Sequence, residues 1–122
     1  MNISFCKSTL GEEEKKAICD VIDSGWVVMG SKTKEFEEKF AEYVGAKHCI
    51  FVDSCTSALD LSVKFLIKHR LVHRKNKFYV PSLTFTSTAE VLVNNGIKPI
   101  FIDVNKDNFC VESPYLSTIQ VH

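Results

Sequence analysis

Three consecutive small residues, Cys55, Thr56 and Ser57, form the stretch of this sequence best suited to chemistry. They lie between an apolar run typical of a strand, residues 49–52, and an apolar run of helical period that extends to Lys68. A strand that turns directly into a helix leaves the first N–H groups of the helix without partners, and the helix dipole adds positive potential there. Both effects favour an anion, so the sequence predicts a phosphate-bearing ligand at this turn.

The same turn has a second interpretation that concerns structure alone. Serine and threonine are preferred at helix starts, because their hydroxyl oxygens accept hydrogen bonds from the free backbone N–H groups. A capped helix start of this kind needs no ligand. The turn by itself therefore leaves two interpretations open, a phosphate site and an ordinary cap.

Composition places the chain among soluble globular proteins. Of its 122 residues, 45% are hydrophobic and 25% are charged, which differs from the composition of disordered chains. Fifteen basic and fifteen acidic residues cancel, so no net field attracts nucleic acid or an anionic membrane. No apolar run approaches the ~20 residues that a membrane span requires. We therefore expect neither nucleic acid nor a membrane as a partner.

Residues 68–77 are the one local concentration of positive charge. They follow the end of a predicted helix, where cations complement the helix dipole. A nucleic-acid site would need more supporting charge and aromatic side chains. We interpret the run as a solvated helix end and loop.

The sequence contains five cysteines, an odd number at long spacings. None belongs to a CxxC pair or to a Cys/His cluster of the kind that holds zinc, so we expect no metal. The first residues lack the apolar core of a signal peptide, which favours a cytoplasmic protein with free thiols. Four cysteines are interpreted as small apolar residues, and Cys55 is the exception because it lies in the turn.

The elements that would position the turn alternate between helix and strand. A capping box at Thr9 and Glu12 predicts the first helix, and Ser24-Gly25 ends it. The second predicted helix is capped by Ser31 and closed by Gly45. The other predicted helices run over residues 57–68 and over residues 84–94, with Asn95-Gly96 as the last C-cap. The predicted strands are residues 48–52, 77–80 and 99–103, and a weak helical turn is predicted at residues 116–119. The expected buried face of the third helix comprises Ala58, Leu59, Leu61, Ser62, Phe65 and Leu66.

The predicted strands are short and mostly apolar, as strands are when both faces of a sheet are covered. Right-handed crossovers would join them into a parallel α/β layer. Three parallel strands make a thin sheet for an independent domain. We therefore expect the chain to be the front part of a larger unit.

Five segments, taken in order, resemble the patterns of one known family. They are residues 24–30, 36–48, 54–59, 80–89 and 96–104. Among them, the third segment resembles the family's sGTxAL turn, and the fourth resembles its vPxxTFxaTa segment. On these motifs the chain is similar to the N-terminal part of the DegT/DnrJ/EryC1/StrS family of pyridoxal-phosphate-dependent sugar aminotransferases. The resemblance implies that residues 1–122 are part of the large domain of the fold-type I (aspartate aminotransferase-like) fold, with helices on a mostly parallel sheet.

The resemblance also implies roles for individual residues. The cofactor phosphate would lie at the turn of Cys55, Thr56 and Ser57. Phe85 would stack on the pyridine ring of pyridoxal phosphate, although plain core packing is its alternative interpretation. Trp26 would lie at the substrate entrance near the subunit interface, with an anchor between two helices as the alternative.

The sequence departs from the family pattern in two respects. The glycine of the sGT turn is replaced by Cys55, whose Cβ would cost about 1–2 kcal/mol if its φ were positive. The family also uses a Schiff-base lysine and an aspartate paired with the pyridine nitrogen, and no lysine here stands in the matching context. We therefore expect the chain to carry half of a cofactor site and to be inactive alone.

The implied reaction of the complete family enzyme transfers an amino group from an amino acid such as glutamate to a keto group of a nucleotide-linked sugar. The resemblance implies a cytoplasmic homodimer and a role in cell-surface polysaccharide biosynthesis. Two alternatives remain open at this point. One is a pyridoxal-phosphate-dependent sugar dehydratase, and the other is a non-catalytic binding module or partner subunit.

Overall fold

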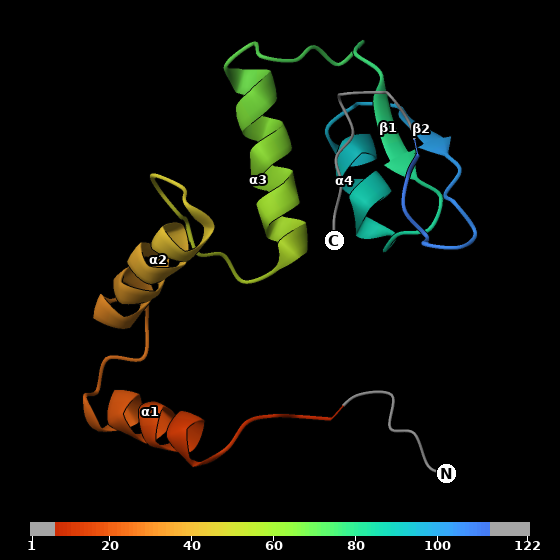
Figure 1. Ribbon diagram of the computed structural model, residues 1–122. Coiled ribbons are helices and arrows are strands. Elements are labelled where there is room, and N and C mark those ends of the chain that lie inside the picture. The colour runs from red at the N-terminus through yellow and green to blue at the C-terminus, as the bar shows by residue number, and fades with distance from the viewer. Residues whose placement is uncertain (1–6, 113–122) are drawn as a thin grey trace. The chain divides into compact units, whose positions relative to one another are not determined.

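The computed structural model describes residues 7–112, which form four helices and two strands (Figure 1). The chain divides into two compact units, Met1–Phe51 and Val52–His122. The helical turn predicted at residues 116–119 lies outside the described residues. No helix among the described residues is long and apolar enough to cross a membrane.

The first unit begins with helix α1 (Glu12–Asp23). The Glu14 carboxylate accepts a hydrogen bond from the N–H of the N-cap residue, Gly11, at 2.6 Å. This bond lowers the pKa of Glu14 below its usual value. The predicted capping box at Thr9 and Glu12 is therefore wrong, because the helix begins two residues later and a different glutamate reaches back. The predicted end is confirmed, with Ser24 as the C-cap.

Helix α2 (Ser31–Val44) follows. The predicted cap at Ser31 is wrong by one residue, because Gly30 is the N-cap and Ser31 is the first residue of the helix. Its C-cap is Gly45, which has a φ of 69°. Glycine adopts this left-handed conformation without strain, so the predicted helix end is confirmed. On the helix surface, the Glu35 carboxylate pairs with Lys39 at 2.8 Å and with Lys32 at 3.2 Å.

Residues 48–52, predicted as a strand, are irregular. The backbone N–H of Phe51 donates to the Glu37 carboxylate of α2 at 2.8 Å instead of to a strand. The Phe51 ring also packs edge-on against Phe36, with centroids 5.4 Å apart. A strand requires a hydrogen-bonded neighbour, and the described residues provide none at this position. The prediction was wrong because an apolar run shows only that a segment is apolar, and not what it pairs with.

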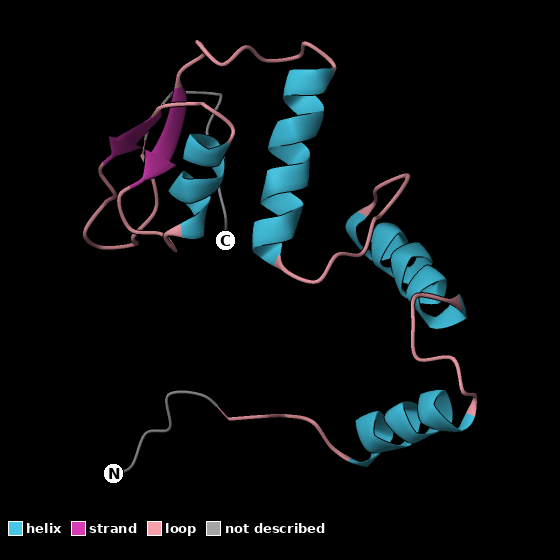
Figure 2. Ribbon diagram, turned by 180° about the vertical axis from the view of Figure 1, so that it is seen from behind, coloured by secondary structure: helices cyan, strands magenta, loops and turns pink. Residues whose placement is uncertain are grey.

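The second unit contains α3 (Cys55–Lys68), β1 (Phe78–Pro81), α4 (Ser87–Asn94) and β2 (Pro99–Ile102). The two strands are parallel, and α4 connects them (Figure 2). In their register, Phe78 lies opposite Pro99 and Val80 opposite Phe101. The second and third predicted strands are thus confirmed, and helices with a parallel sheet form the predicted α/β layer.

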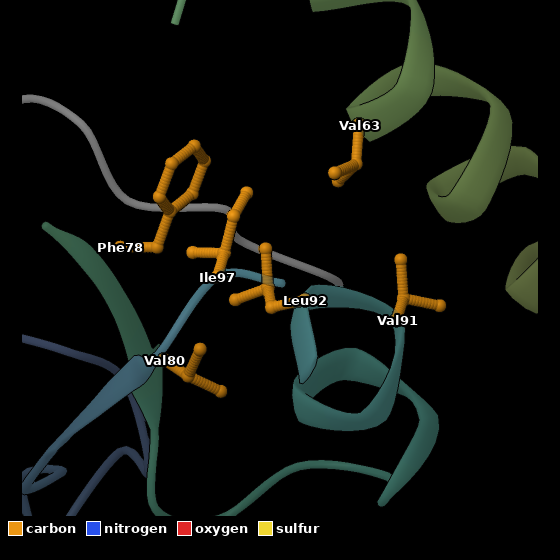
Figure 3. Packing of buried hydrophobic residues seen from close by; sticks show 6 residues of the cluster. All are labelled: Val63, Phe78, Val80, Val91, Leu92 and Ile97. Atoms are coloured by element: carbon orange, nitrogen blue, oxygen red, sulfur yellow. The ribbon is translucent and has the colours of Figure 1, made fainter. Parts of the chain in front are cut away.

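Six buried apolar side chains form the core of the second unit (Figure 3). They come from α3, β1, α4 and the segment before β2, and they are Val63, Phe78, Val80, Val91, Leu92 and Ile97. Helix α3 contributes Val63, which was not among the residues of its predicted buried face. Leu59 packs against this core, whereas Leu61, Ser62 and Phe65 are exposed. The prediction was too broad because only one narrow face of α3 meets α4.

Helix α4 starts at Ser87, three residues after its predicted start, and ends at the predicted Asn95 cap. The Asn95 amide donates to the Asp60 carboxylate of α3 at 2.8 Å. Lys64 donates to the other oxygen of the same carboxylate. The Lys64 bond, followed by the Asn95 bond, lowers the pKa of Asp60. A polar clamp therefore joins α3 to the end of α4 beside the apolar core.

Replacement of Leu92 by alanine should lower the free energy of unfolding by about 2–5 kcal/mol, because the fully buried side chain leaves a cavity. Urea unfolding followed by far-UV circular dichroism measures the change. The matched control is Val93→Ala at the next position, where the side chain is 58% exposed. It should change the free energy by less than about 0.5 kcal/mol. Equal losses for the two variants would contradict the described core.

Replacement of Asp60 by asparagine should destabilise the protein at neutral pH and have no effect in strong acid. The lowered pKa means that the ionised carboxylate stabilises the fold at any pH above the unfolded pKa, about 3.9. This contribution is lost as the pH falls through the lower pKa of the folded state. Urea unfolding at pH 7 and at about pH 2 measures both regimes. Asp107→Asn, at an exposed position, is the control. If Asp60→Asn still lowers the free energy of unfolding in acid, the ionised Asp60 carboxylate is not the source of the stabilisation.

Candidate cofactor site

The turn before α3 is capped by a residue that was not named among the predicted site residues. Ser54 is the N-cap, and its hydroxyl oxygen accepts a hydrogen bond from the Ser57 N–H at 3.2 Å. Its carbonyl oxygen accepts the N–H of Ala58 at 3.0 Å. The sequence signal was present, because a serine three residues before the bonded N–H is the usual N-cap spacing. The capping interpretation is therefore correct for one N–H group of the turn, that of Ser57.

Two further N–H groups of the turn remain available. Cys55 and Thr56 are the first two residues of α3, both are exposed, and their N–H groups have no hydrogen-bond partner among residues 7–112. A helix of 14 residues adds its dipole at this end. The cap therefore leaves room for the predicted anion site, since the two would use different N–H groups.

Cys55 adopts a helical conformation and carries no backbone strain. Among the described residues other than glycine, only Arg70 and Phe109 have a positive φ. The energetic cost considered for a cysteine in place of the family's glycine is therefore not incurred. The Cβ of Cys55 leaves the backbone of the turn in the geometry of a normal helix start.

Phe85 lies in the segment between β1 and α4, and its side chain is 76% exposed. The core-packing interpretation is therefore wrong for the described residues. The Phe85 carbonyl accepts the N–H of Thr88 at 3.0 Å, which fixes the backbone just before α4. In the same segment the Thr84 and Thr88 hydroxyl groups are hydrogen-bonded at 3.0 Å. An open aromatic ring on a held backbone is able to stack on a planar ligand.

The start of α3, the end of β1 and the start of α4 all point to the same end of the second unit (Figures 1 and 2). Ligands of parallel α/β sheets bind outside the carboxyl ends of the strands. Cys55 and Thr56 stand at the start of α3, and Phe85 lies just before α4. The topology therefore brings the free N–H groups and the exposed ring to the end of the unit where such ligands bind.

Trp26 belongs to the first unit, in the link between α1 and α2, and is 62% exposed. Its indole N–H donates to the carbonyl oxygen of Met29 at 3.1 Å. The ring lies against Gly30, where an added Cβ would come within 2.6 Å of the indole nitrogen. The indole is thus held within its own link.

One surface hollow of about 190 Å³ lies on α2 and the segment after it. Charged and polar side chains line much of it, including Lys34, Glu37 and His48. It contains none of the residues predicted for the cofactor or the substrate entrance. The candidate site is therefore defined by the helix start and the exposed ring, and not by this hollow.

Comparison with known proteins identifies the family. The model of the DegT/DnrJ/EryC1/StrS aminotransferase family matches residues 8–118. The spore coat polysaccharide biosynthesis protein SpsC of Bacillus subtilis is 34% identical over 84% of this chain and 25% of its own length. The UDP-4-amino-4-deoxy-L-arabinose–oxoglutarate aminotransferase of Shewanella sediminis is 30% identical over 90% of this chain and 27% of its own length.

A solved structure gives the same result for the fold. The Escherichia coli GDP-4-keto-6-deoxy-D-mannose-3-dehydratase with bound hydrated PLP is 29% identical to this chain, with a TM-score of 0.80. The match covers 85% of this chain and 27% of the dehydratase. The predicted partial fold-type I aminotransferase fold is thereby confirmed.

The chain spans about a quarter of the length of the curated relatives that it matches. The family model, by contrast, covers nearly all of the chain. The five motifs, the α/β layer and the family match agree with one another. The chain belongs to the DegT/DnrJ/EryC1/StrS aminotransferase family.

Proposed function

We propose that residues 1–122 are the N-terminal portion of the pyridoxal-phosphate-binding domain of a nucleotide-sugar aminotransferase. The enzyme would transfer an amino group from an amino acid such as glutamate to a keto group of the sugar. The family match supports the reaction class. The relative named for spore coat polysaccharide biosynthesis supports a role in making cell-surface polysaccharides. We further propose that the complete enzyme acts in the cytoplasm as a homodimer.

The observation that carries the proposal is the pairing of two free N–H groups with an exposed aromatic ring at one end of the second unit. The N–H groups of Cys55 and Thr56 would donate to phosphate oxygens, aided by the dipole of α3. Ser57 would contribute its hydroxyl hydrogen, because its N–H donates to Ser54 and its hydroxyl oxygen accepts from the Ser54 hydroxyl at 3.0 Å. Phe85 would cover one face of the pyridine ring and exclude water from it.

Pyridoxal phosphate, when bound, supplies the electron sink for amino transfer. The residues of this chain would hold its phosphate and ring in a fixed orientation. Proton transfer requires the Schiff-base lysine that the family resemblance implies. The lysines of this chain lie on surface helices, in loops or before β2. Holding and orienting the cofactor is therefore the part of the activity that we assign to these residues.

A second candidate function is dehydration of a nucleotide-linked keto sugar. It is supported by the likeness of this chain to the Escherichia coli dehydratase, with a TM-score of 0.80. The structure of that dehydratase contains bound PLP. Sequencing of the gene beyond the codon for His122 distinguishes the two. A lysine in the context of the family's Schiff-base residue supports amino transfer, and a histidine there supports dehydration. A stop codon together with a well-folded monomer supports a binding module.

The purified chain should show no amino transfer from glutamate to a nucleotide-linked keto sugar when pyridoxal phosphate is added. The reason is the missing Schiff-base lysine, without which the proton is not moved. Mass spectrometry of the sugar product measures the reaction. An authentic aminotransferase of the family serves as the positive control, and amino sugar formed by the chain alone would refute the division of roles proposed here.

Pyridoxamine phosphate should shift the backbone amide signals of Cys55, Thr56 and Ser57 in a titration of the ¹⁵N-labelled chain. The amine form of the cofactor is chosen because it has no aldehyde to react with surface lysines. Pyridoxamine, which lacks the phosphate, should leave these three signals unchanged. Shifts that are equal for both compounds, or that map elsewhere, would count against the phosphate turn.

The same titration tests the stacking ring. Phe85→Ala should weaken binding of pyridoxamine phosphate about two- to tenfold, the range expected for one lost aromatic pair. Phe101→Ala is the matched control, because Phe101 is also an exposed phenylalanine, 60% accessible, and lies on β2. An equal loss of affinity for pyridoxamine phosphate in both variants would contradict the stacking role proposed for Phe85.

A further inference from the structure

The lysines of the described residues differ in whether they form ion pairs, and Lys15 and Lys64 pair with carboxylates of their own helices. The lysines of α2 are paired with glutamates, as in Lys32–Glu35, Lys39–Glu35 and Lys34–Glu38. The basic loop, which we define as residues 68–77, contains Lys68, Arg70, Arg74, Lys75 and Lys77. None of these five cations forms an ion pair with a described residue. Although the chain has no net charge, the basic loop is therefore a strongly positive part of its surface.

The sequence around the basic loop adds to this separation of charge. No aspartate or glutamate occurs between Asp60 and Glu90. Every residue of the loop is exposed except Val72, which packs against the core. The loop crosses from the end of α3 to the start of β1, away from the start of α3 (Figure 1). Since α3 has 14 residues, the loop lies about 21 Å along the helix from the phosphate turn.

The basic loop is ordered and contains a strained residue. Arg70 has a φ of 57°, in the left-handed region where glycine is favoured after a helix. The N–H groups of Arg70 and Leu71 donate to carbonyl oxygens of the last turn of α3, at 3.0 and 2.9 Å. Further along, Asn76 accepts the N–H of His73 at 2.9 Å and closes a turn. A cation kept at a strained position in an ordered loop is a reason to look for a function.

Leu71 lies in the middle of these cations, and its side chain is 64% exposed. An exposed leucine among unpaired cations matches the chemistry of a bilayer surface, where cations meet anionic headgroups and an apolar side chain enters the acyl boundary. Single-stranded nucleic acid is a poorer match, because it needs aromatic rings for stacking. The loop has no phenylalanine, tyrosine or tryptophan, and Phe78 after it is buried. The exposed ring before it, Phe65, already contacts the His69 ring of the loop, with centroids 4.2 Å apart.

Net charge alone led us to expect no membrane partner, but the unpaired cations around Leu71 change that expectation. We propose that the basic loop is a docking surface for an anionic phospholipid membrane. The chain would lie on the membrane and not cross it. Lys68, Lys75 and Lys77 would contact the headgroups, and Leu71 would enter the bilayer surface. The surface is independent of the proposed cofactor site, because it lies at the other end of α3.

Co-sedimentation of the full 122-residue chain with vesicles tests this proposal. The chain should sediment with vesicles of phosphatidylcholine that contain phosphatidylserine, and not with phosphatidylcholine alone. Lys68→Gln, Lys75→Gln and Lys77→Gln combined should weaken binding about a hundredfold, at roughly fivefold for each cation. Salt at about 1 M should abolish binding, because the Debye length is then only ~3 Å.

The matched control removes the same charge from the paired surface. Lys32→Gln, Lys34→Gln and Lys39→Gln combined should leave binding within about twofold, because those lysines already face glutamates. Leu71→Ser should weaken binding without changing the charge. Circular dichroism confirms that each variant is folded.

Three outcomes would overturn the proposal. The first is no binding to vesicles with phosphatidylserine. The second is an equal loss for the two lysine triple variants, which would mean that only net charge acts. The third is tighter binding to a DNA duplex or to a poly-glutamate peptide than to the vesicles, which would assign the loop to nucleic acid or to an acidic protein.

Discussion

Burial of the apolar side chains between α3, α4 and the two strands is the interaction on which the second unit depends. Val63 is the buried residue that α3 contributes to this core, and Leu59 and Ile67 flank it one turn to either side. Because a helix is rigid over 14 residues, fixing its centre also fixes both of its ends. One end then presents free N–H groups, and the other leads into the basic loop. The hydrogen bond between Asp60 and Asn95 also fixes how α3 and α4 are oriented against each other. Hydrogen bonds depend on angle, whereas apolar packing does not.

The turn of residues 54–57 illustrates how a structural role leaves room, within a few residues, for the binding role that we propose. Ser54 satisfies one backbone donor of α3, and this stabilises the helix start without using the donors nearest the end. The remaining donors of Cys55 and Thr56 cost little when they are exposed, because water serves them. A ligand with oxygen atoms would replace that water. The cap therefore would not compete with the proposed anion.

Prediction from the sequence succeeded where local chemistry determines the structure. Gly45 and Asn95 ended their helices as expected, because a helix end is set by a few neighbouring residues. Prediction failed where the outcome depends on distant partners. Residues 48–52 are apolar enough for a strand, but Phe51 bonds to Glu37 and no strand lies beside it.

The geometry of the candidate site was likewise predictable only in part. The turn at Cys55 was evident from the change of period at this point in the sequence. The cap by Ser54 was predictable from its spacing to Ser57. The exposure of Phe85 could not be derived, because the packing of an aromatic residue depends on which elements cover it. The role proposed for Phe85 rests on the family resemblance and not on the physical pattern.

The close contact between Gly30 and the Trp26 indole has a consequence for how this link can vary. Any side chain at position 30 would push the ring off the carbonyl of Met29. Conversely, a smaller residue at position 26 would leave space for a side chain at position 30. The two positions therefore behave as one unit under mutation, so that a change at one is tolerated best when the other changes with it.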